Sequence, residues 1–434
     1  MKEHPPILER AEIHRSEWVA PVSSPPVHNG AVLTYRGRVV EVGPFPSIRS
    51  SPSASGARLL DHGRAALFPA LVNAHTHLEL SDLKDKVPMP QPDFREWIAL
   101  LFALRASSSH VLSSEGESES DRALSSCIGV DEALRLGEAE LMSGGAGLCA
   151  DITNGDAAFE LTRRDGPERL IFLELLGFNL SSAAEAMPSN LTLRSEPVSQ
   201  AIPVPHSAYS VSPAIISECK AWTRARGLPY SIHVAEHIHE IEFLSTGRGF
   251  CREVLDWVGR WDPLWSPPGK TPVEYLDGLG VLDSRTLLVH AVHMNENDWT
   301  IAARRACNVI FCPRSNRNTG SGRPRIEKAL LPGLTCALAT DSLASNTDLN
   351  LFSEAGFVLD EYPSIDPRRV LEMITINPAR SLGRQSDYGS IEPGRKACML
   401  AVEIGAGVKE SNLAEALIQS GQEGAWKWVR PPQN

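Results

Sequence analysis

Eight short apolar runs, separated by longer segments compatible with helices, are the feature that most constrains this sequence. The runs are Leu67–Ala74, Gly147–Ile152, Arg169–Leu176, Ala201–Pro205, Tyr230–Val234, Thr286–Val289, Asn308–Phe311 and Thr335–Ala339. Helices are predicted over Val130–Met142, Ile215–Arg226 and, after the last run, Asp348–Leu359. Short strands that alternate with helices are typical of an α/β fold with parallel strands. Eight such units in roughly 300 residues predict a (β/α)8 TIM-like barrel.

The two ends of the chain predict a second, smaller domain. Two short strands joined near Arg36 and Gly37 have the pattern of a β-hairpin within residues 29–45. A turn followed by a strand, within residues 388–402, is expected to return to this hairpin and complete a composite β-sandwich domain. The predicted organisation is residues 1–65 and 385–434 in the small β domain and residues 66–384 in the barrel.

Composition and charge restrict the class of protein. The 434 residues carry a formal net charge of -11, which argues against nucleic acid or an anionic membrane as a partner. Hydrophobic residues make up 42% and charged residues 22%, as in soluble globular enzymes. The Ser- and Glu-rich segment Ser107–Ser126 is expected to be a solvated loop between two β–α units.

Cysteine usage and the N-terminus indicate a cytoplasmic protein. The eight cysteines are scattered without a Cys-x-x-Cys pair, so reduced thiols are expected. The N-terminus is charged and lacks an apolar signal core, and no apolar run approaches the roughly 20 residues that span a bilayer. We therefore expect a soluble protein of the cytoplasm, and the expected partner is a small-molecule substrate. The sequence leaves the oligomeric state open, a homodimer included.

A His-x-His pair follows the first apolar run. Side chains at i and i+2 of a strand point to the same face, so His75 and His77 can reach one metal ion together. Glu79 would keep the same phase if the strand continued. Imidazole is a common ligand of zinc and similar divalent ions. Taken alone, the His-x-His pair is weak evidence for a metal site, because two partly exposed histidines at a strand end are more common than metal ligands.

Other polar side chains stand at the ends of later runs, where barrel enzymes place their working residues. Three imidazoles and one carboxylate make a plausible shell for one divalent ion, most simply zinc, with Fe²⁺ or Mn²⁺ also suited. Glu236 lies three residues after His233 and could serve as general base and then general acid, while His290 could bind a developing oxyanion. The fourth run, Ala201–Pro205, is followed by His206 and not by a lysine that could bridge two metal ions, which favours a single metal. The assigned ligands are His75, His77, His233 and Asp341.

The order of these residues resembles the amidohydrolase superfamily. Their context resembles its mononuclear deaminase/chlorohydrolase branch, in particular Val72-Asn-Ala-His-Thr-His-Leu78, Cys312-Pro-Arg-Ser-Asn316 and Ala339-Thr-Asp-Ser-Leu-Ala-Ser-Asn346. Within that branch, the Glu79 context, Phe94-x-x-Trp97 and residues 267–276 look like the aminodeoxyfutalosine deaminases of menaquinone biosynthesis. Three short stretches depart from the pattern: Pro69-Ala70, Arg317-Asn318-Thr319, which we expect near the pocket, and Lys396–Met399.

The resemblance implies hydrolytic deamination of a 6-aminopurine nucleoside, with 6-amino-6-deoxyfutalosine as the first expectation and ammonia as a product. It also implies that Glu236 protonates the ring nitrogen, that Asp341 helps move a proton to the departing ammonia, and that His206 contacts the substrate. Glu79 would bind the sugar or purine, or else form a salt bridge at the rim. Alternatives are deamination of adenosine, S-adenosylhomocysteine, methylthioadenosine or guanine, or removal of chloride from a triazine. A silent scaffold would have lost metal ligands, and here all are present. Supporting roles are expected for Glu240 and His293.

Overall fold

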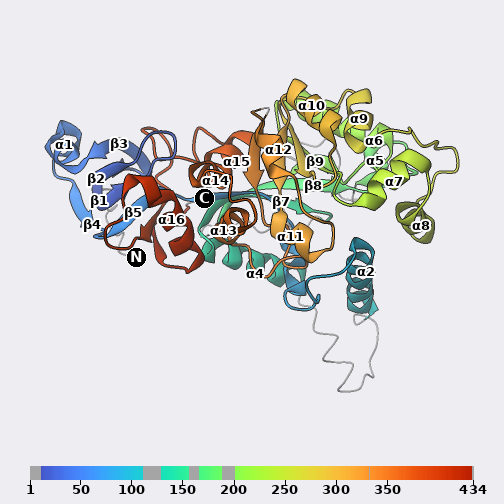
Figure 1. The fold of residues 1–434 in the computed structure, drawn as a ribbon, viewed down its shortest axis with the longest axis horizontal. Helices are drawn as coiled ribbons and strands as arrows, with labels where there is room; N and C mark the ends of the chain where they lie inside the picture. Colours follow the sequence, from blue (N-terminus) through green and yellow to red (C-terminus); the bar gives the residue numbers. More distant parts are fainter. Residues whose placement is uncertain (1–10, 111–128, 156–165, 188–200, 332, 433–434) are drawn as a thin grey trace, which may run out of the picture.

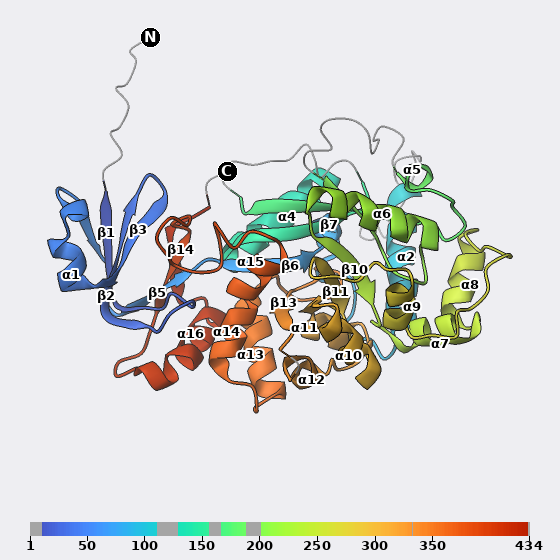
Figure 2. The same ribbon diagram turned by 90° about the horizontal axis from the view of Figure 1, so that it is seen from above.

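The computed structural model describes residues 11–110, 129–155, 166–187, 201–331 and 333–432. Its strands form one sheet of seven strands and two parallel sheets of four. Figures 1 and 2 both show the seven-stranded sheet at one end of the long axis, with the parallel strands and their helices along the rest. Within the described part of the chain, every helix is too short or too polar to cross a bilayer.

The seven-stranded sheet combines strands from both ends of the chain. β2 and β3 form the predicted hairpin, and Arg36 and Gly37 at its turn both have positive φ, as the twist of a two-residue turn requires. β14 is the predicted returning strand, and the β-sandwich arrangement stays a prediction. The strands are, in sheet order, β15 (Trp426–Arg430), β14 (Met399–Glu403), β5 (Ala65–Pro69), β1 (Glu12–Val19), β2 (Val27–Tyr35) and β3 (Arg38–Pro44), with β4 (Arg58–Asp61) paired to β1.

Each of the eight predicted runs overlaps a parallel strand. The first sheet is β6 (Leu71–Thr76), β7 (Ala146–Thr153), β8 (Glu168–Leu175) and β9 (Ala201–Pro205), and the second is β10 (Tyr230–Val234), β11 (Thr286–His290), β12 (Asn308–Phe311) and β13 (Thr335–Leu338). The two sheets meet at both edges. Ser207, after β9, bridges to His233 of β10, and the amide of Asp341, after β13, donates to the carbonyl of His75 in β6 at 3.2 Å.

The prediction of a single strand over Leu67–Ala74 is wrong, because this segment contains parts of two strands. β5 ends at Pro69 and pairs with β1 and β14, whereas β6 begins at Leu71 in the first parallel sheet. Every residue of both strands is buried, so hydrophobicity does not mark the boundary between them. The change of sheet takes place at Ala70, whose amide donates to the carbonyl of Cys398 at 3.0 Å.

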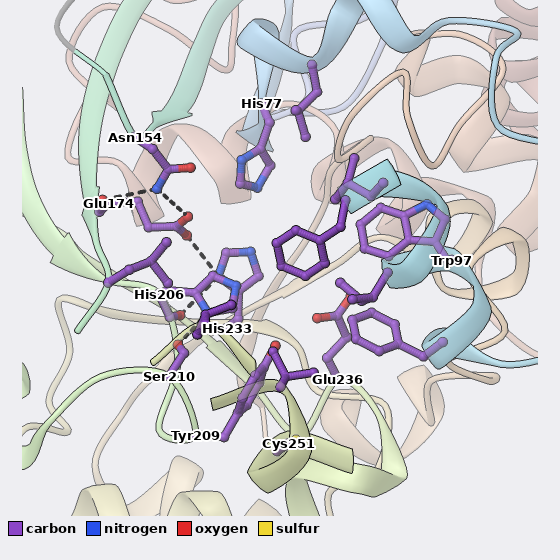
Figure 3. A pocket seen from close by; sticks show the side chains of 18 of the residues that line it. His77, Trp97, Asn154, Glu174, His206, Tyr209, Ser210, His233, Glu236 and Cys251 are labelled. Carbon is purple, nitrogen blue, oxygen red and sulfur yellow. Dashed lines mark hydrogen bonds and ion pairs between the residues drawn. The ribbon is translucent and has the colours of Figure 1, made fainter. Parts of the chain in front are cut away.

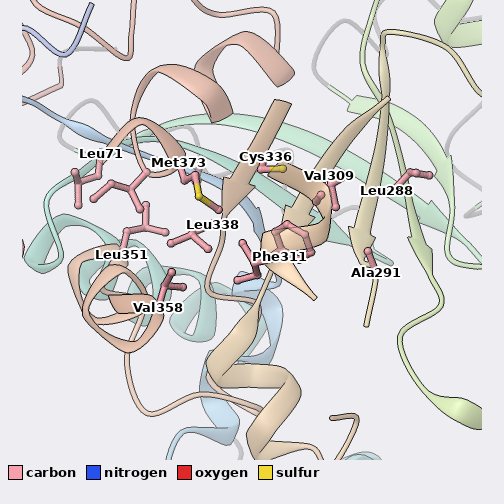
Figure 4. Packing of buried hydrophobic residues seen from close by; sticks show 14 of the residues in the cluster. Leu71, Leu288, Ala291, Val309, Phe311, Cys336, Leu338, Leu351, Val358 and Met373 are labelled. Atoms are coloured by element: carbon pink, nitrogen blue, oxygen red, sulfur yellow. The ribbon is translucent and has the colours of Figure 1, made fainter. Parts of the chain in front are cut away.

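Alternate residues of the parallel strands belong to two buried apolar clusters. In β7, Leu148 and Ala150 contribute to one cluster and Cys149 to the other. Val72 of the first sheet and Val289 of the second both belong to the cluster that contains Leu148 and Ala150, so the two sheets share an interior. Figure 4 shows part of the other cluster, which contains Cys149 and packs between β11–β13 and the helices that follow β13. Strands buried on both faces read as continuous apolar runs rather than alternating ones.

The three predicted helices are confirmed with small shifts of their ends, as α4 (Val130–Ser143), α6 (Pro213–Arg226) and α13 (Leu351–Glu361). The bounds of α6 follow from its caps: the Ser212 side chain accepts from the Ile215 amide, and Gly227 takes the left-handed conformation at the C-cap. Residues 107–110, predicted as loop, end α2 (Phe94–His110), and residues 111–128 of that segment lie outside the described residues.

The other described helices are short and mostly follow a strand. They are α1 (Phe45–Ser50), α5 (Ala183–Ala186), α7 (Ile238–Thr246), α8 (Phe250–Trp257), α9 (Pro272–Gly278), α10 (Glu296–Arg304), α11 (Pro313–Asn318), α12 (Ile326–Leu330), α14 (Pro367–Met373), α15 (Ile376–Ser381) and α16 (Leu413–Gln422), with 3-10 turns η1 (Pro52–Ala54), η2 (Leu78–Leu83) and η5 (Glu410–Asn412). The site described next lies at the C-terminal ends of the parallel strands.

Candidate metal and active site

Three histidines from both parallel sheets converge at these strand ends. His75 lies in β6, His77 follows that strand, and His233 lies in β10. The ring centroids of His75 are 4.9 Å from those of His77 and 4.8 Å from those of His233. One ring nitrogen from each of the three lies within 4.8 Å of the others. The predicted same-face arrangement of the His-x-His pair is therefore present.

Asp341 adds a carboxylate from the end of β13. Its Oδ1 lies 3.9 Å from His75 Nε2 and 3.7 Å from His77 Nε2. Its Oδ2 accepts hydrogen bonds from the hydroxyls of Ser315, at 2.6 Å, and Ser345, at 3.0 Å. Asp341 also has a φ of 58°, a conformation that is costly for a non-glycine residue and is often found at functional sites. The hydroxyls thus fix one carboxylate oxygen and leave the other facing the histidines.

The donor set fits a divalent ion. His75 is fully buried, yet neither of its ring nitrogens has a hydrogen-bond partner in the described part of the chain. Burial lowers the pKa of His75 well below its ordinary value, and the neighbouring histidines act in the same direction, so the ring is neutral. A buried imidazole without partners needs an explanation. A metal ion held by neutral imidazoles and a carboxylate supplies one.

His233 is oriented by groups behind it. Its Nδ1 lies 3.0 Å from the carbonyl oxygen of His206, which can only accept, so Nδ1 carries the proton and Nε2 keeps its lone pair. The carboxylate of Glu174 lies 3.4 Å from the same Nδ1. Asn154, after β7, donates to Glu174 Oε2 at 3.1 Å. Such partners fix the tautomer of a metal-binding histidine and raise its basicity.

Glu236 and His290 form a second pair beside the histidines. His290 Nε2 lies 3.5 Å from Glu236 Oε1. The side-chain amide nitrogen of Asn316 donates to His290 Nδ1 at 3.0 Å, which leaves the ring proton on Nε2. Burial, with the charges of His77 and His206, lowers the pKa of His290 to about 3. Burial and the negative charges of nearby carboxylates, Asp341 first, raise the pKa of Glu236 well above its ordinary value.

The two predicted substrate-binding residues line the same cavity. His206 Nδ1 lies 2.6 Å from the Ser210 hydroxyl, and burial lowers the pKa of His206 to about 3. Glu79 accepts from the Thr153 hydroxyl at 2.7 Å and lies 3.4 Å from the guanidinium of Arg105. The salt bridge that was the alternative for Glu79 is therefore present, and the carboxylate still borders the cavity.

The cavity has a volume of about 420 Å³ and two unlike walls. Figure 3 shows Asn154, Glu174 and His206 on one side, with Trp97 of α2 on the opposite side. The remaining polar and charged lining includes His77, Glu79, Ser210, His233, Glu236, His290, Asp341 and Ser342. A volume of this size lies within the roughly 300–1,000 Å³ of small-molecule sites.

Comparison with known proteins now identifies the family. The profile of the Amidohydrolase family matches residues 66–423. The chain belongs to the amidohydrolase family.

Named relatives of this amidohydrolase are deaminases. A 5-methylthioadenosine/S-adenosylhomocysteine deaminase of Nitratidesulfovibrio vulgaris (strain DP4) is 28% identical over 398 residues, which cover 88% of this chain and 80% of the relative. An aminodeoxyfutalosine deaminase of Deinococcus radiodurans is 34% identical over 194 residues, covering 42% of this chain and 46% of the relative. The crystal structure of Helicobacter pylori aminofutalosine deaminase, at 20% identity, has a TM-score of 0.77 and covers 94% of this chain and 96% of its own.

The predicted resemblance to this family is confirmed, and it indicates a hydrolase that acts on C–N bonds. The supporting residues also have defined positions. Glu240 is fully buried and accepts from the Glu236 amide at 3.2 Å, and His293 Nε2 lies 2.8 Å from the Ser321 carbonyl. The departing stretch Arg317-Asn318-Thr319 does not line the cavity, although it was expected near the pocket. Asn318 instead donates to the Ser345 carbonyl at 3.0 Å.

Sequence reasoning missed Glu174 and Asn154 as site residues of this amidohydrolase. Glu174 stands inside the apolar run of β8, one residue before the strand ends. A carboxylate at the C-terminal end of a parallel strand, after four apolar residues, was a usable signal. Asn154 offered no comparable signal, because an asparagine after a strand is common in turns.

Proposed function

We propose that this amidohydrolase is a metal-dependent hydrolytic deaminase of a 6-aminopurine nucleoside, and that its substrate is 6-amino-6-deoxyfutalosine. The observation that carries the proposal is the convergence of His75, His77, His233 and Asp341 at a cavity that Glu236 and His290 also line. The names of the relatives support the choice of a purine nucleoside. We also propose that the two parallel sheets, which touch at both edges, form a single (β/α)8 barrel.

The four ligands would hold one divalent ion, for which zinc is the simplest candidate given three imidazoles and one carboxylate. Such an ion would supply Lewis-acid activation of a water molecule near neutral pH. His233 is preset for this role because its proton lies on Nδ1 and its lone pair on Nε2. Asp341 is prepared to bind the ion because Ser315 and Ser345 donate only to its Oδ2, which leaves Oδ1 for the ion.

Proton movements are assigned to three side chains. Glu236 takes a proton from the attacking water and returns it to the ring nitrogen beside the amine-bearing carbon, a task that suits its raised pKa. His290 donates its Nε2 hydrogen to the oxygen that becomes bonded to that carbon. Asp341 carries the second proton of the water to the departing amine. The water oxygen thus ends on the ring and its two protons on the ring nitrogen and ammonia.

The polar wall of the cavity suits a sugar. The carboxylates of Glu79 and Glu174 can accept hydrogen bonds from ribose hydroxyls, and both border the cavity. His206 lies beside them, where the purine ring would enter between the sugar and the metal ligands. This arrangement favours a nucleoside over a free base or a triazine.

The test is ammonia release by the purified, metal-loaded protein. The panel is 6-amino-6-deoxyfutalosine, adenosine, S-adenosylhomocysteine, methylthioadenosine and guanine. Selective turnover of the first is expected. Preference for another nucleoside would keep the deaminase and change its substrate. No ammonia from any of them, with metal bound, would overturn the proposed function.

A further inference from the structure

The cavity extends beyond the polar groups into an apolar corridor between α2 and α8. One wall of the corridor is the face of α2 that carries Trp97, Leu101 and Phe102, and the other is the face of α8 with Val254 and Val258. The rings of Phe102 and Trp257 meet edge to face across the two helices, with centroids 5.0 Å apart. A ribose and purine held at the polar wall would leave this apolar volume unfilled.

One cation at the end of α8 borders this corridor. Arg260 lines the cavity, and its position is fixed by the turn that ends α8, where its amide donates to the Leu255 carbonyl at 2.8 Å. The preceding Gly259 has a φ of 66°, and its carbonyl accepts from the Asn179 side chain at 3.4 Å. This turn therefore ties the end of α8 to the loop that follows β8.

Arg260 differs from Arg105, the other arginine that lines the cavity, because it has no carboxylate partner among the residues that the structure describes. Arg105, which also lines the cavity, pairs with Glu79, and Arg252 pairs with Asp256 and stacks on Trp261. Arg260 forms no ion pair with any residue that the structure describes. An unpaired guanidinium at the mouth of an apolar pocket is suited to a single negative charge on a ligand.

We propose that Arg260 and the apolar corridor form a specificity subsite for the 5′ arm of the substrate. The arm is apolar along its length, where it contacts α2 and α8, and it ends in a carboxylate that binds the Arg260 guanidinium. The subsite rests on the proposed function, since the nucleoside part of the ligand is placed by the polar wall. It selects a nucleoside with an apolar, carboxylate-bearing arm over adenosine and methylthioadenosine.

The test compares Arg260→Ala with Arg248→Ala. Arg248 is an exposed arginine between α7 and α8 that does not line the cavity, so its loss removes the same charge without touching the subsite. Each metal-loaded enzyme is assayed with adenosine, methylthioadenosine and aminodeoxyfutalosine, whose arm carries a carboxylate. For the last, Arg260→Ala should lower kcat/KM by about tenfold to a hundredfold, mainly through KM. Activity on the two uncharged nucleosides should change by less than about twofold, and Arg248→Ala should match the wild type throughout.

Two results would overturn the subsite while the deaminase stands. One is an equal loss on all three nucleosides in Arg260→Ala, which would indicate a structural role at the end of α8. The other is wild-type activity on adenosine that equals or exceeds activity on the carboxylate-bearing nucleoside. Absence of turnover with every nucleoside in the wild type would instead refute the proposed function, and the subsite with it.

Discussion

At the scale of single residues, the site is organised by hydrogen bonds that set the protonation of each group. The His206 carbonyl places the His233 proton on Nδ1, and the Asn316 amide places the His290 proton on Nε2. Ser315 and Ser345 hold one oxygen of Asp341. The proposed metal ligands and the two proposed catalytic side chains are thus oriented before substrate binds, which is what electrostatic preorganisation requires.

Two variants, at Glu236 and at His233, should show that proton transfer and metal binding depend on different residues. Glu236→Gln keeps the size of the side chain but cannot take a proton, so turnover should fall by at least about a thousandfold while bound metal stays near one per chain. His233→Ala should lose the metal. Metal content by mass spectrometry and ammonia release measure both. Substantial activity in Glu236→Gln, or stoichiometric metal in His233→Ala, would show that the roles are misassigned.

Asn316 should act as a positioning residue for His290. Removing its amide in Asn316→Ala frees the imidazole to take the other tautomer, so kcat should fall by roughly tenfold to a hundredfold with little change in KM. Metal content should not change, because His290 is not among the ligands. Asn377→Ala is the control: Asn377 also donates an amide hydrogen bond, to the Cys336 carbonyl at 2.9 Å, away from the cavity. Equal losses in both variants would contradict a specific role for Asn316.

Glu240 should make stability depend on pH. Burial raises the pKa of Glu240 from its ordinary 4.5 to about 8, so between these values the folded protein holds a proton that the unfolded chain has lost. Its contribution to the free energy of unfolding, on the order of a few kcal/mol, is present at low pH and is lost as pH rises through this window. Glu240→Gln cannot ionise. Its Tm relative to wild type should therefore rise by roughly 3 °C between pH 5.5 and 8.5, and a constant difference would show that Glu240 does not titrate there.

At the scale of elements, α2 and the residue before it are held over the cavity by contacts with distant parts of the chain. The Trp97 indole donates to the Ala344 carbonyl at 3.0 Å, and Asp93 lies 3.2 Å from His239. Gly320 allows the closest approach: a Cβ there would lie 2.7 Å from the Asp93 amide nitrogen, and its φ is 73°. The apolar wall of the cavity depends on these contacts.

Gly320→Ala should therefore displace the start of α2. We expect KM to rise by about tenfold, since small displacements of substrate-positioning groups are costly. Gly383→Ala is a matched control, because Gly383 also has positive φ, at 68°, and a Cβ there would meet nothing within 4 Å. Steady-state kinetics on both variants separate the contact with residues 91–93 from backbone strain. A similar KM in the two variants would argue against α2 as a wall of the substrate site.

Most parallel strands could be predicted from the sequence because each is a short buried run between helical segments. The break at Ala70 could not, because β5 and β6 are both buried throughout and no polar residue separates them. The proposed His and Asp ligands could be found because they lie at or just after strand ends. Asn154 and the walls from α2 and α8 come from segments whose positions only tertiary contacts determine. The cytoplasmic location, the domain boundaries and a homodimer stay predictions.

At the scale of the whole molecule, the candidate ligands join the two parallel sheets. His75 and His77 lie at the end of β6 in the first sheet, while His233 lies in β10 and Asp341 follows β13, both strands of the second sheet. An ion bound by all four would stabilise the folded state by mass action, because the unfolded chain does not hold the ligands together. Chelation should therefore lower Tm by roughly 5 °C, and stoichiometric zinc should restore it. His233→Ala should show the lower Tm from the start and no response to chelator. A wild-type Tm that is insensitive to chelator, with metal removal verified, would mean that the ion does not link the two sheets.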